Sequence, residues 1–390
     1  MAARRRSLAR RRKSLGFSQE SLAEALGVDP KTVQRWERGV TEDGPQPWLR
    51  PKLARLLEVS PDGLEALLVD VERDDGEPDE RLAYTLQHPG SVDLTAVARL
   101  RERVHELDER YDRAPSTSLL AETGQALGQV TFLSSHAKTQ RIRRELSAVE
   151  AESAILMGQL VWDASQRRDH ATAHRYFDQA VTAARKVHDT AAEGLALLRK
   201  SYVALYGETD PDTGLTLTRR AAETTAETSH VLSGLALLHA AEAHAMRGEL
   251  AECEQALGEA ETRFEQIDED DAAIELFSPT QHGRLAGSCY LFLGRAKQAE
   301  PILQATAAQL RDRSKSQAIV LGNLSLVYIR QAKLDEAAGT LHGAMDVIEA
   351  TWGGGGLNIL FDACREMQPW RTEPSVQDVY DRVMTLMATR

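Results

Sequence analysis

The sequence predicts an all-α protein in which a small N-terminal helical domain precedes a long array of helical hairpins. The N-terminal part contains two short helices separated by a tight turn, and pairs of small residues seven positions apart recur farther along the chain. Only 5% of the 390 residues are aromatic, and alanine, leucine, glutamate and arginine dominate, a composition that favours close-packed helices. We expect a first domain at 1–70, an acidic linker at 71–90, a helical connector at 91–147, helical repeats at 148–350 and a C-terminal segment at 351–390.

Charge is distributed unevenly along the chain. Residues 1–66 hold 13 basic and 9 acidic residues, a net +4, whereas the whole chain carries −12 and the remainder therefore −16. A basic head on an acidic body fits a protein that offers one surface to nucleic acid. The three cysteines are too widely spaced for a disulfide framework or a zinc knuckle, and no apolar run approaches 18 residues. We expect a soluble, cytoplasmic protein without a membrane segment.

The first domain is organised around residues 17–39. Ser18 and Asp29 suit helix N-caps, Pro30 suits a first helical position, and Gly27 and Gly39 suit helix ends. Two crossing helices would share a small apolar core of Leu22, Ala23, Leu26, Val28, Val33 and Trp36. The outward positions are rich in hydrogen-bond donors and poor in carboxylates, which suits contact with the floor of a DNA major groove. These positions are Gln19, Lys31, Thr32, Gln34 and Arg35.

The segment SQESLAEALGV, the helix opening DPKT and the following RWERG resemble the helix-turn-helix of the Xre/Cro repressor family, over about Leu8 to Leu68. The resemblance implies a lambda-repressor-like fold, with further helices at Trp48 to Leu57 and Pro61 to Leu68. It also implies a structural pair between Arg12 and Glu37.

By the same resemblance, the helix from Pro30 lies in the major groove. Lys31 and Arg35 would read base edges, and Gln19 would contact a phosphate. Pro30 stands where many relatives carry a polar, base-contacting residue, which leaves the operator sequence open. The expected DNA-binding residues are Gln19, Pro30, Lys31, Thr32, Gln34, Arg35 and Arg38. The basic residues between Arg4 and Lys13 either contact phosphates or form a solvated face.

Between the first domain and the repeats, the acidic stretch from Val69 to Glu80 reads as a linker. A helix capped by Ser91 or Asp93 should follow, and others at about Thr117 to Ser134 and Lys138 to Gln166. The first of these carries a short heptad seam, which pairs either with a second subunit or with its own chain. The seam consists of Val97, Leu100, Val104, Leu107 and Tyr111.

The small residues that recur seven apart predict helical hairpins, because two helices cross closely only where small side chains separate their backbones. The pairs are Ala173/Ala180, Gly214/Ala221, Cys253/Ala260, Ala299/Thr306 and Ala337/Ala344. The pattern resembles a tetratricopeptide (TPR) array with lengthened loops. We expect the glycine run in TWGGGGL at 351–357 to form a loop, since four glycines cannot hold a helix. Capping helices are expected at about Leu357 to Glu366 and Val376 to Ala388.

In tetratricopeptide arrays, the first helix of each hairpin lines the concave face. Residues fourteen positions before each first small residue should point into that groove, and these are Gln159, Lys200, His239, Leu285 and Asn323. Neighbouring inward positions add Trp162, Arg199, Glu242, Arg284 and Arg330. Amides and cations of this kind can bind a peptide backbone and its carboxylate, although an open concave face is also polar simply because it is wet.

No catalytic arrangement is evident. His170 and His174, like His239 and His244, lack the glutamate and third ligand of a metal-binding HExxH motif, and Ser288-Cys289 lacks a nucleophile elbow. We therefore expect no enzyme activity, metal or cofactor.

The combination resembles Xre-type regulators with tetratricopeptide bodies, common in actinobacteria, and more distantly peptide-sensing quorum regulators. It implies a homodimeric transcriptional regulator that binds a double-stranded DNA operator and senses a peptide, a small molecule or a protein partner. The alternative is a scaffold that is located by its DNA-binding domain and has no small effector.

Overall fold

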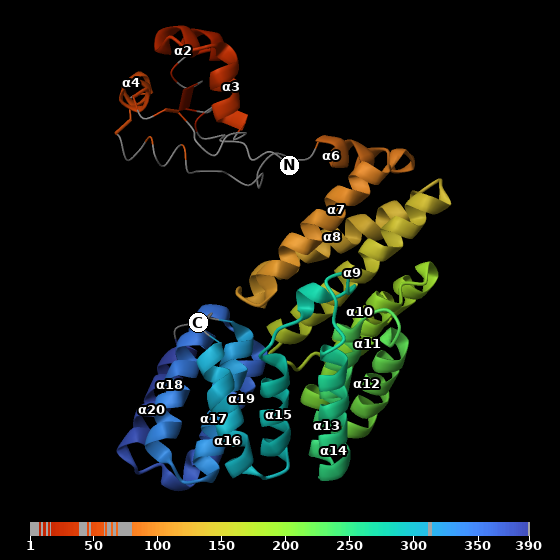
Figure 1. Cartoon of the computed structure of the whole chain (residues 1–390), viewed down its shortest axis with the longest axis vertical. Coiled ribbons are helices and arrows are strands. Elements are labelled where there is room, and N and C mark those ends of the chain that lie inside the picture. Colours follow the sequence, from red (N-terminus) through yellow and green to blue (C-terminus); the bar gives the residue numbers. More distant parts are fainter. Residues whose placement is uncertain are drawn as a thin grey trace. The chain divides into compact units, whose positions relative to one another are not determined.

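The computed structural model describes residues 8, 11–12, 15, 17–38, 45–46, 48–57, 59–60, 64, 68, 80–310 and 314–388. All regular elements in these segments are helical, which confirms the predicted all-α class (Figure 1). The chain divides into two compact units, Met1–Ala83 and Tyr84–Arg390. The division falls inside helix α6 (Glu80–Gln87), so part of the segment predicted as a linker to residue 90 is helical. The stretch from Val69 to Asp79 lies outside the described residues.

The N-terminal unit contains α2 (Gln19–Leu26), α3 (Pro30–Arg38) and α4 (Arg50–Leu56). Ser18 caps α2 through a reciprocal bond pair, since its Oγ accepts from the Ser21 amide at 3.0 Å and the Ser21 Oγ accepts from the Ser18 amide at 2.8 Å. Gly27 ends α2 in the left-handed region, at φ 77°. Asp29 then accepts from the Lys31 amide at 2.8 Å. These contacts confirm the predicted helix boundaries, except at Gly39, which lies outside the described residues.

The core of this unit is apolar and buried. Leu22, Ala23, Leu26, Val33 and Trp36 pack together as predicted, with Val28 partly buried against them. Burying one such large side chain contributes roughly 1.5–3 kcal/mol. The core is completed by Leu8, Leu53, Ala54, Leu57, Leu64 and Leu68. Leu64 and Leu68 are the only described residues of the helix expected at Pro61 to Leu68.

The second unit begins with the turn η1 (Pro89–Ser91) and three long helices, α7 (Leu94–Tyr111), α8 (Ser116–His136) and α9 (Gln140–Ala164). Asp93 caps α7, with its Oδ1 accepting from the Ala96 amide at 2.9 Å. The heptad seam of α7 is buried against α8 and α9, except for Tyr111, which is half-buried. The seam therefore packs within its own chain, which is one of the two interpretations of the sequence.

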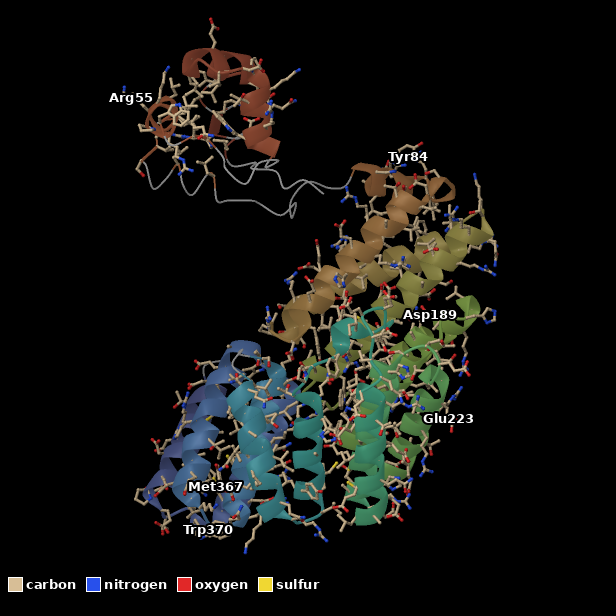
Figure 2. The ribbon with its side chains drawn as sticks, viewed as in Figure 1. Arg55, Tyr84, Asp189, Glu223, Met367 and Trp370 are labelled. Atoms are coloured by element: carbon tan, nitrogen blue, oxygen red, sulfur yellow. The ribbon has the colours of Figure 1, made fainter. Side chains whose placement is uncertain are left out.

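Six helical hairpins follow one another from α9 onwards. After α9 they comprise α10 (His170–Val187), α11 (Thr190–Tyr202), α12 (Pro211–Thr225), α13 (His230–Met246), α14 (Leu250–Phe264), α15 (Gln281–Phe292), α16 (Ala296–Gln309), α17 (Lys315–Arg330), α18 (Leu334–Thr351), α19 (Gly354–Met367) and α20 (Pro374–Ala388). Short turns η2 (Val203–Gly207), η3 (Ile274–Leu276) and η4 (Gln368–Trp370) lie between them; Met367 and Trp370 are labelled in Figure 2.

The predicted small pairs lie on the second helices α10, α12, α14, α16 and α18, and every member is buried. The helices pack closely at these positions: at Gly214, for example, a Cβ atom would lie only 2.3 Å from Leu205 Cδ2. This confirms the predicted array of TPR-like hairpins.

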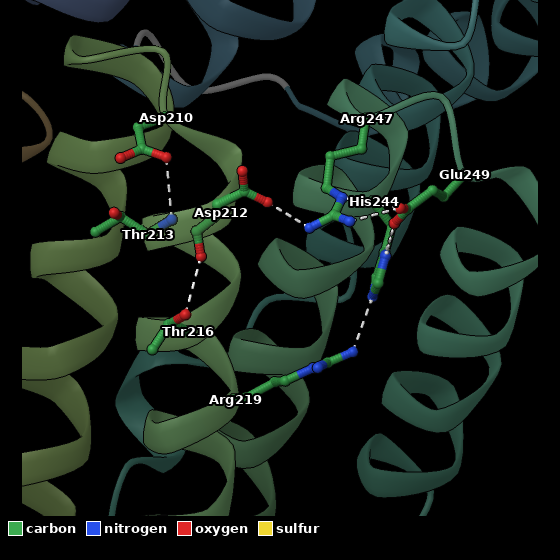
Figure 3. A network of polar contacts seen from close by, with 8 residues as sticks. All are labelled: Asp210, Asp212, Thr213, Thr216, Arg219, His244, Arg247 and Glu249. Atoms are coloured by element: carbon green, nitrogen blue, oxygen red, sulfur yellow. Dashed lines mark hydrogen bonds and ion pairs between the residues drawn. The ribbon is translucent and has the colours of Figure 1, made fainter.

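Side-chain caps and ion pairs fix the ends of these helices. Asp189, labelled in Figure 2, caps α11 by accepting from the Ala192 amide at 2.9 Å. Figure 3 shows the junction of α12, α13 and α14, where Arg247 bonds both Asp212 and Glu249. The same junction contains His244, which contacts Glu249 at 2.6 Å.

The glycine run does not form the expected loop. Gly354, Gly355 and Gly356 are the first three residues of α19. A Cβ on Gly354 would lie 2.9 Å from the Asp163 carbonyl oxygen, and one on Gly356 would lie 2.8 Å from the Ala318 Cβ. The expectation was wrong because close packing against neighbouring helices outweighs the helix cost of about 1 kcal/mol per glycine.

The last hairpin returns to the first, since α19 packs against α9. The contact is built around the buried Asp163 carboxylate, whose Oδ1 accepts from the Gly354 amide at 2.7 Å. Its Oδ2 lies 2.9 Å from Lys315 Nζ and accepts from Ser116 Oγ at 2.6 Å. We call Asp163, Lys315, Ser116 and the Gly354 amide the Asp163 cluster. Lys315 Nζ also lies 4.0 Å from the Tyr111 ring centroid, which brings the end of α7 to the cluster.

Replacing Gly354 by alanine should destabilise the protein by about 1–3 kcal/mol, because the added methyl group meets the backbone of α9. Gly339 is the matched control, since it is an exposed glycine inside α18 with no atom near its Cβ position. Gly339→Ala should stabilise by roughly 0.5–1 kcal/mol through helix propensity. Urea denaturation of both variants checks the pair, and equal effects would contradict the tight contact at Gly354.

Candidate functional site

Helix α3 buries one face and presents the other to solvent. Val33 and Trp36 lie in the core, whereas Pro30, Lys31 and Arg35 are exposed. Thr32 and Gln34 are half-buried at the edges of the exposed face, and Arg38 is the last residue of the helix. The predicted base-reading residues therefore share one accessible helix surface, and their contact with DNA stays a prediction.

A buried ion pair fixes this helix to the rest of its unit. Arg12 Nε lies 2.7 Å from Glu37 Oε1, and Arg12 also donates to the Phe17 carbonyl at 2.6 Å. The structural pair between Arg12 and Glu37 is thus confirmed. Gln19 joins it, because its Nε2 donates to Glu37 Oε2 at 2.5 Å. The side-chain amide of Gln19 is thus bound to Glu37, and the phosphate contact expected of Gln19 stays a prediction.

The second unit encloses a cavity of about 710 Å³ between the first helices of its hairpins, α9, α11, α13, α15, α17 and α19. This volume is in the range of cavities that bind small molecules. Nearly all the residues expected in the groove line it, namely Gln159, Trp162, Arg199, His239, Glu242, Arg284, Leu285, Asn323 and Arg330.

Lys200 is the exception, and its predicted place in the groove is wrong. Its Nζ instead lies 2.5 Å from Asp178 on α10. Lys200 therefore lies on the side of α11 that meets α10. Arg199 occupies the inward position.

The sequence did not reveal several lining residues that come from irregular backbone. Gln166 and Arg167 follow α9 with φ values of 54° and 61°, a strained conformation for side chains of this size. Tyr206 lies in η2, a π-helical turn that widens the end of α11. Neither motif has a sequence signal, since no glycine marks the positive φ angles and no proline marks the π turn.

Aromatic rings line the cavity beside the arginines. The Arg167 Cζ lies 4.6 Å from the Trp162 ring centroid and 6.0 Å from that of Tyr206. The Arg199 Cζ lies 5.3 Å from the Tyr202 ring centroid. Guanidinium groups stacked in this way keep their in-plane N–H donors available for other acceptors.

A buried hydrogen-bond chain crosses the cavity wall from η2 to α15. The hydroxyls of Tyr206 and Ser288 donate to the two carboxylate oxygens of Glu242, and Tyr206 Oη lies 2.5 Å from His239 Nδ1. Because the Tyr206 hydroxyl donates its hydrogen bond to Glu242, its oxygen accepts from His239, and the neutral imidazole therefore carries its proton on Nδ1.

Burial lowers the pKa of His239 and so favours this neutral form. For Glu242, burial acts to raise the pKa, yet the hydrogen bonds from His239, Ser288 and Tyr206 hold it below its usual value. The chain therefore has an ionised carboxylate and a neutral imidazole, and the Ser288 hydroxyl donates to that carboxylate.

The described residues contain no group of histidine, cysteine and carboxylate side chains that could hold a metal ion. None of the described helices is long and apolar enough to cross a membrane.

The helix-turn-helix family HTH_3 matches residues 8–64, so this part of the chain is a helix-turn-helix DNA-binding domain, as its residues predicted. No curated protein matches the chain. Among solved structures, the fold is similar to that of a Rap protein complexed with competence and sporulation factor, with 13% identity and a TM-score of 0.41, covering 80% of this chain and 99% of that one. It is also similar to the apo form of the quorum sensor NprR from B. thuringiensis, with 12% identity and a TM-score of 0.43, covering 95% of this chain and 94% of that one.

Replacing Glu37 by alanine should destabilise the N-terminal unit by roughly 3–5 kcal/mol, because Arg12 is left buried without its partner. Glu24→Ala is the control, since Glu24 is an exposed carboxylate on α2 and its loss should change stability by less than about 0.5 kcal/mol. Hydrogen exchange of the α2 and α3 amides in the full chain measures both. Unchanged protection in Glu37→Ala would show that the pair is dispensable.

Proposed function

We propose that this chain is a transcriptional regulator whose α3 helix reads an operator and whose cavity binds an effector that changes operator affinity. The observation that carries the proposal is the presence, in one chain, of a DNA-binding domain and a cavity of about 710 Å³ lined by both polar and apolar side chains. A peptide, a small molecule or a segment of a partner protein could each be the effector of such a cavity.

Two amides support the effector role. Gln159 and Asn323 line the cavity with only 6% and 7% of their surface exposed, and the described residues provide no hydrogen bond to either side chain. Neither side chain is among the fully buried, unbonded polar groups, so both amides are open to the cavity. A ligand with its own amide or hydroxyl groups would satisfy both residues, because each amide offers a donor and an acceptor.

The route from the cavity to the DNA-binding domain begins at the Asp163 cluster. Asp163, Lys315 and Tyr111 line the cavity and also form the contact that closes the array. Tyr111 is the last residue of α7, and α6, which leads to the DNA-binding domain, precedes α7 in the chain. We propose that the effector favours one geometry of this contact, which requires different affinities for the two geometries.

Operator selection should depend on Lys31 and Arg35. With an operator obtained by selection from random DNA, Lys31→Ala together with Arg35→Ala should relax base preference at the contacted positions by about 1–3 kcal/mol each. Arg55→Ala, which removes an exposed arginine of α4, is the control and should keep the preference. If the double variant protects the same operator as the wild type, α3 is not the reading helix.

A homodimer should protect two half-sites on the operator, with their centres about 10 bp apart or a multiple of this.

Effector response should depend on the cavity amides. Gln159→Ala with Asn323→Ala should abolish any change in operator affinity caused by the low-molecular-weight fraction of a cell extract. Lys200→Ala is the control, because Lys200 lies outside the cavity and should leave the response intact. A response that is unchanged in the amide variant would place the sensor elsewhere. A wild type that does not respond at all would favour the scaffold function.

A further inference from the structure

Three arginines line the cavity without an ion pair, although the charge of Arg199 acts on Asp108 of α7 and partly offsets the rise that burial causes in the pKa of that carboxyl. Arg167, Arg199 and Arg284 line it, and the described residues provide no hydrogen-bond acceptor or ion pair for any of the three guanidinium groups. The Nε atoms of Arg167 and Arg199 are fully buried and unbonded. Leaving a partly buried charge unpaired is costly, so three such groups in one cavity call for an explanation.

The other cations of the cavity wall are neutralised. Arg330 forms two bonds to Glu366, at 3.1 and 2.8 Å, and Lys315 is held by Asp163. Arg365 is paired with Asp362 on its own helix. Outside the cavity, Arg247 has two carboxylate partners, as Figure 3 shows. Among the described cations that line the cavity, only these three guanidinium groups lack an ion pair.

The carboxylates of the cavity are already engaged. Asp163, Asp362 and Glu366 hold the paired cations, and Asp112 acts on Lys315. The remaining acid, Glu242, receives the hydroxyls of Tyr206 and Ser288 on its two oxygens. No acid of the cavity wall forms an ion pair with the three free arginines.

The three guanidinium groups come from different elements toward one region. Arg167 follows α9, Arg199 lies near the end of α11, and Arg284 lies in the first turn of α15. The charges of Arg199 and Arg284 both act on His239, and those of Arg167 and Arg199 both act on Tyr111. The backbone is strained at Gln166 and Arg167, which is a further sign that the Arg167 side chain is held in place.

We propose that the ligand of this cavity is an organic anion, whose carboxylate or phosphate group is bound by Arg167, Arg199 and Arg284. Guanidinium groups bind both kinds of oxyanion in a bidentate manner. The anion can be the terminus of a short peptide or the acid group of a small metabolite. This inference rests on the proposed function only in taking the cavity as the effector site.

The aromatic and apolar residues of the cavity indicate what the ligand carries besides its acid group. Trp162 and Tyr202 provide flat aromatic surfaces beside the arginines, and Leu285 and Leu326 provide an apolar wall. The ligand should therefore combine its acid group with an apolar or aromatic body. Free inorganic phosphate, which has no such body, should bind more weakly than an organic phosphate.

The test uses the full-length protein and defined probes in isothermal titration calorimetry. The probes are phenylacetate, phenyl phosphate and the neutral phenylacetamide, together with one short peptide as its free acid and as its C-terminal amide. At least one of the acids should bind at least about tenfold more tightly than its neutral counterpart. Preference for the peptide acid or for a small acid identifies the source of the anion. Equal binding of acids and neutral counterparts, or no binding of either at millimolar concentration, overturns the proposal.

Variants separate the three arginines from general charge effects. Arg199→Met and Arg284→Met should each weaken binding of the acid at least about tenfold, whereas Arg365→Met removes a paired charge from the same wall and should change it less than about threefold. In the absence of ligand, the first two variants should melt at the same temperature as the wild type or higher, because an unpaired charge is removed. Loss of the fold in both, or acid binding equal to the wild type, contradicts the assignment.

The outcome also distinguishes this inference from the proposed function. An acid that binds in an arginine-dependent way without changing operator affinity would support the anion site and contradict the sensor. A neutral compound that changes operator affinity while no acid binds would support the sensor and contradict the anion site.

Discussion

The buried carboxylate of Asp163 is the contact on which the geometry of the second unit depends. It joins helices that lie far apart in sequence, because its partners are Lys315 on α17 and the amide of Gly354 on α19. A buried charge of this kind is tolerated only when its bonds are complete, and removal of one partner leaves several kcal/mol uncompensated. With the contact made, the first helices of the hairpins surround a cavity.

The positive charges that line the same cavity are not all paired with carboxylates. Most charged side chains of the second unit have partners at hydrogen-bond distance, whereas Arg167, Arg199 and Arg284 have none among the described residues. Sites that bind ligands often reduce the stability of the empty protein in this way, because groups arranged for a ligand are poorly satisfied without it. Since these unpaired charges lie beside the Asp163 cluster, a bound anion would act directly on the contact that closes the array.

The sequence predicted the parts of this structure that depend on local residue types. Ser18 and Asp29 marked the helix boundaries, and the small residues such as Ala173 and Ala180 marked the second helices of the hairpins. Helical spacing selected ten inward positions, and nine of these residues line the cavity. Counting fourteen positions back from Gly214 selected Lys200, whereas its neighbour Arg199 lines the cavity.

What the sequence could not predict depends on tertiary contacts. The run Gly354–Gly356 is helical only because other helices press against it, and no local rule reports such neighbours. Arg167 enters the cavity from a backbone conformation that its residue type disfavours, and Tyr206 enters from a π-helical turn. The closure of the array, which brings residues about two hundred positions apart into contact, likewise has no signal in the spacing.

The most direct test of coupling between the cavity and the DNA-binding domain is the affinity of the full-length protein for its bound anion, measured by calorimetry with and without saturating operator DNA. Linkage requires that operator and effector change each other's affinity by the same factor, and allosteric coupling between two sites typically amounts to a factor of about 5–150. We expect operator DNA to change the affinity for the anion by a factor in that range. Equal affinities in the presence and absence of operator DNA would contradict the proposal that the cavity controls DNA binding.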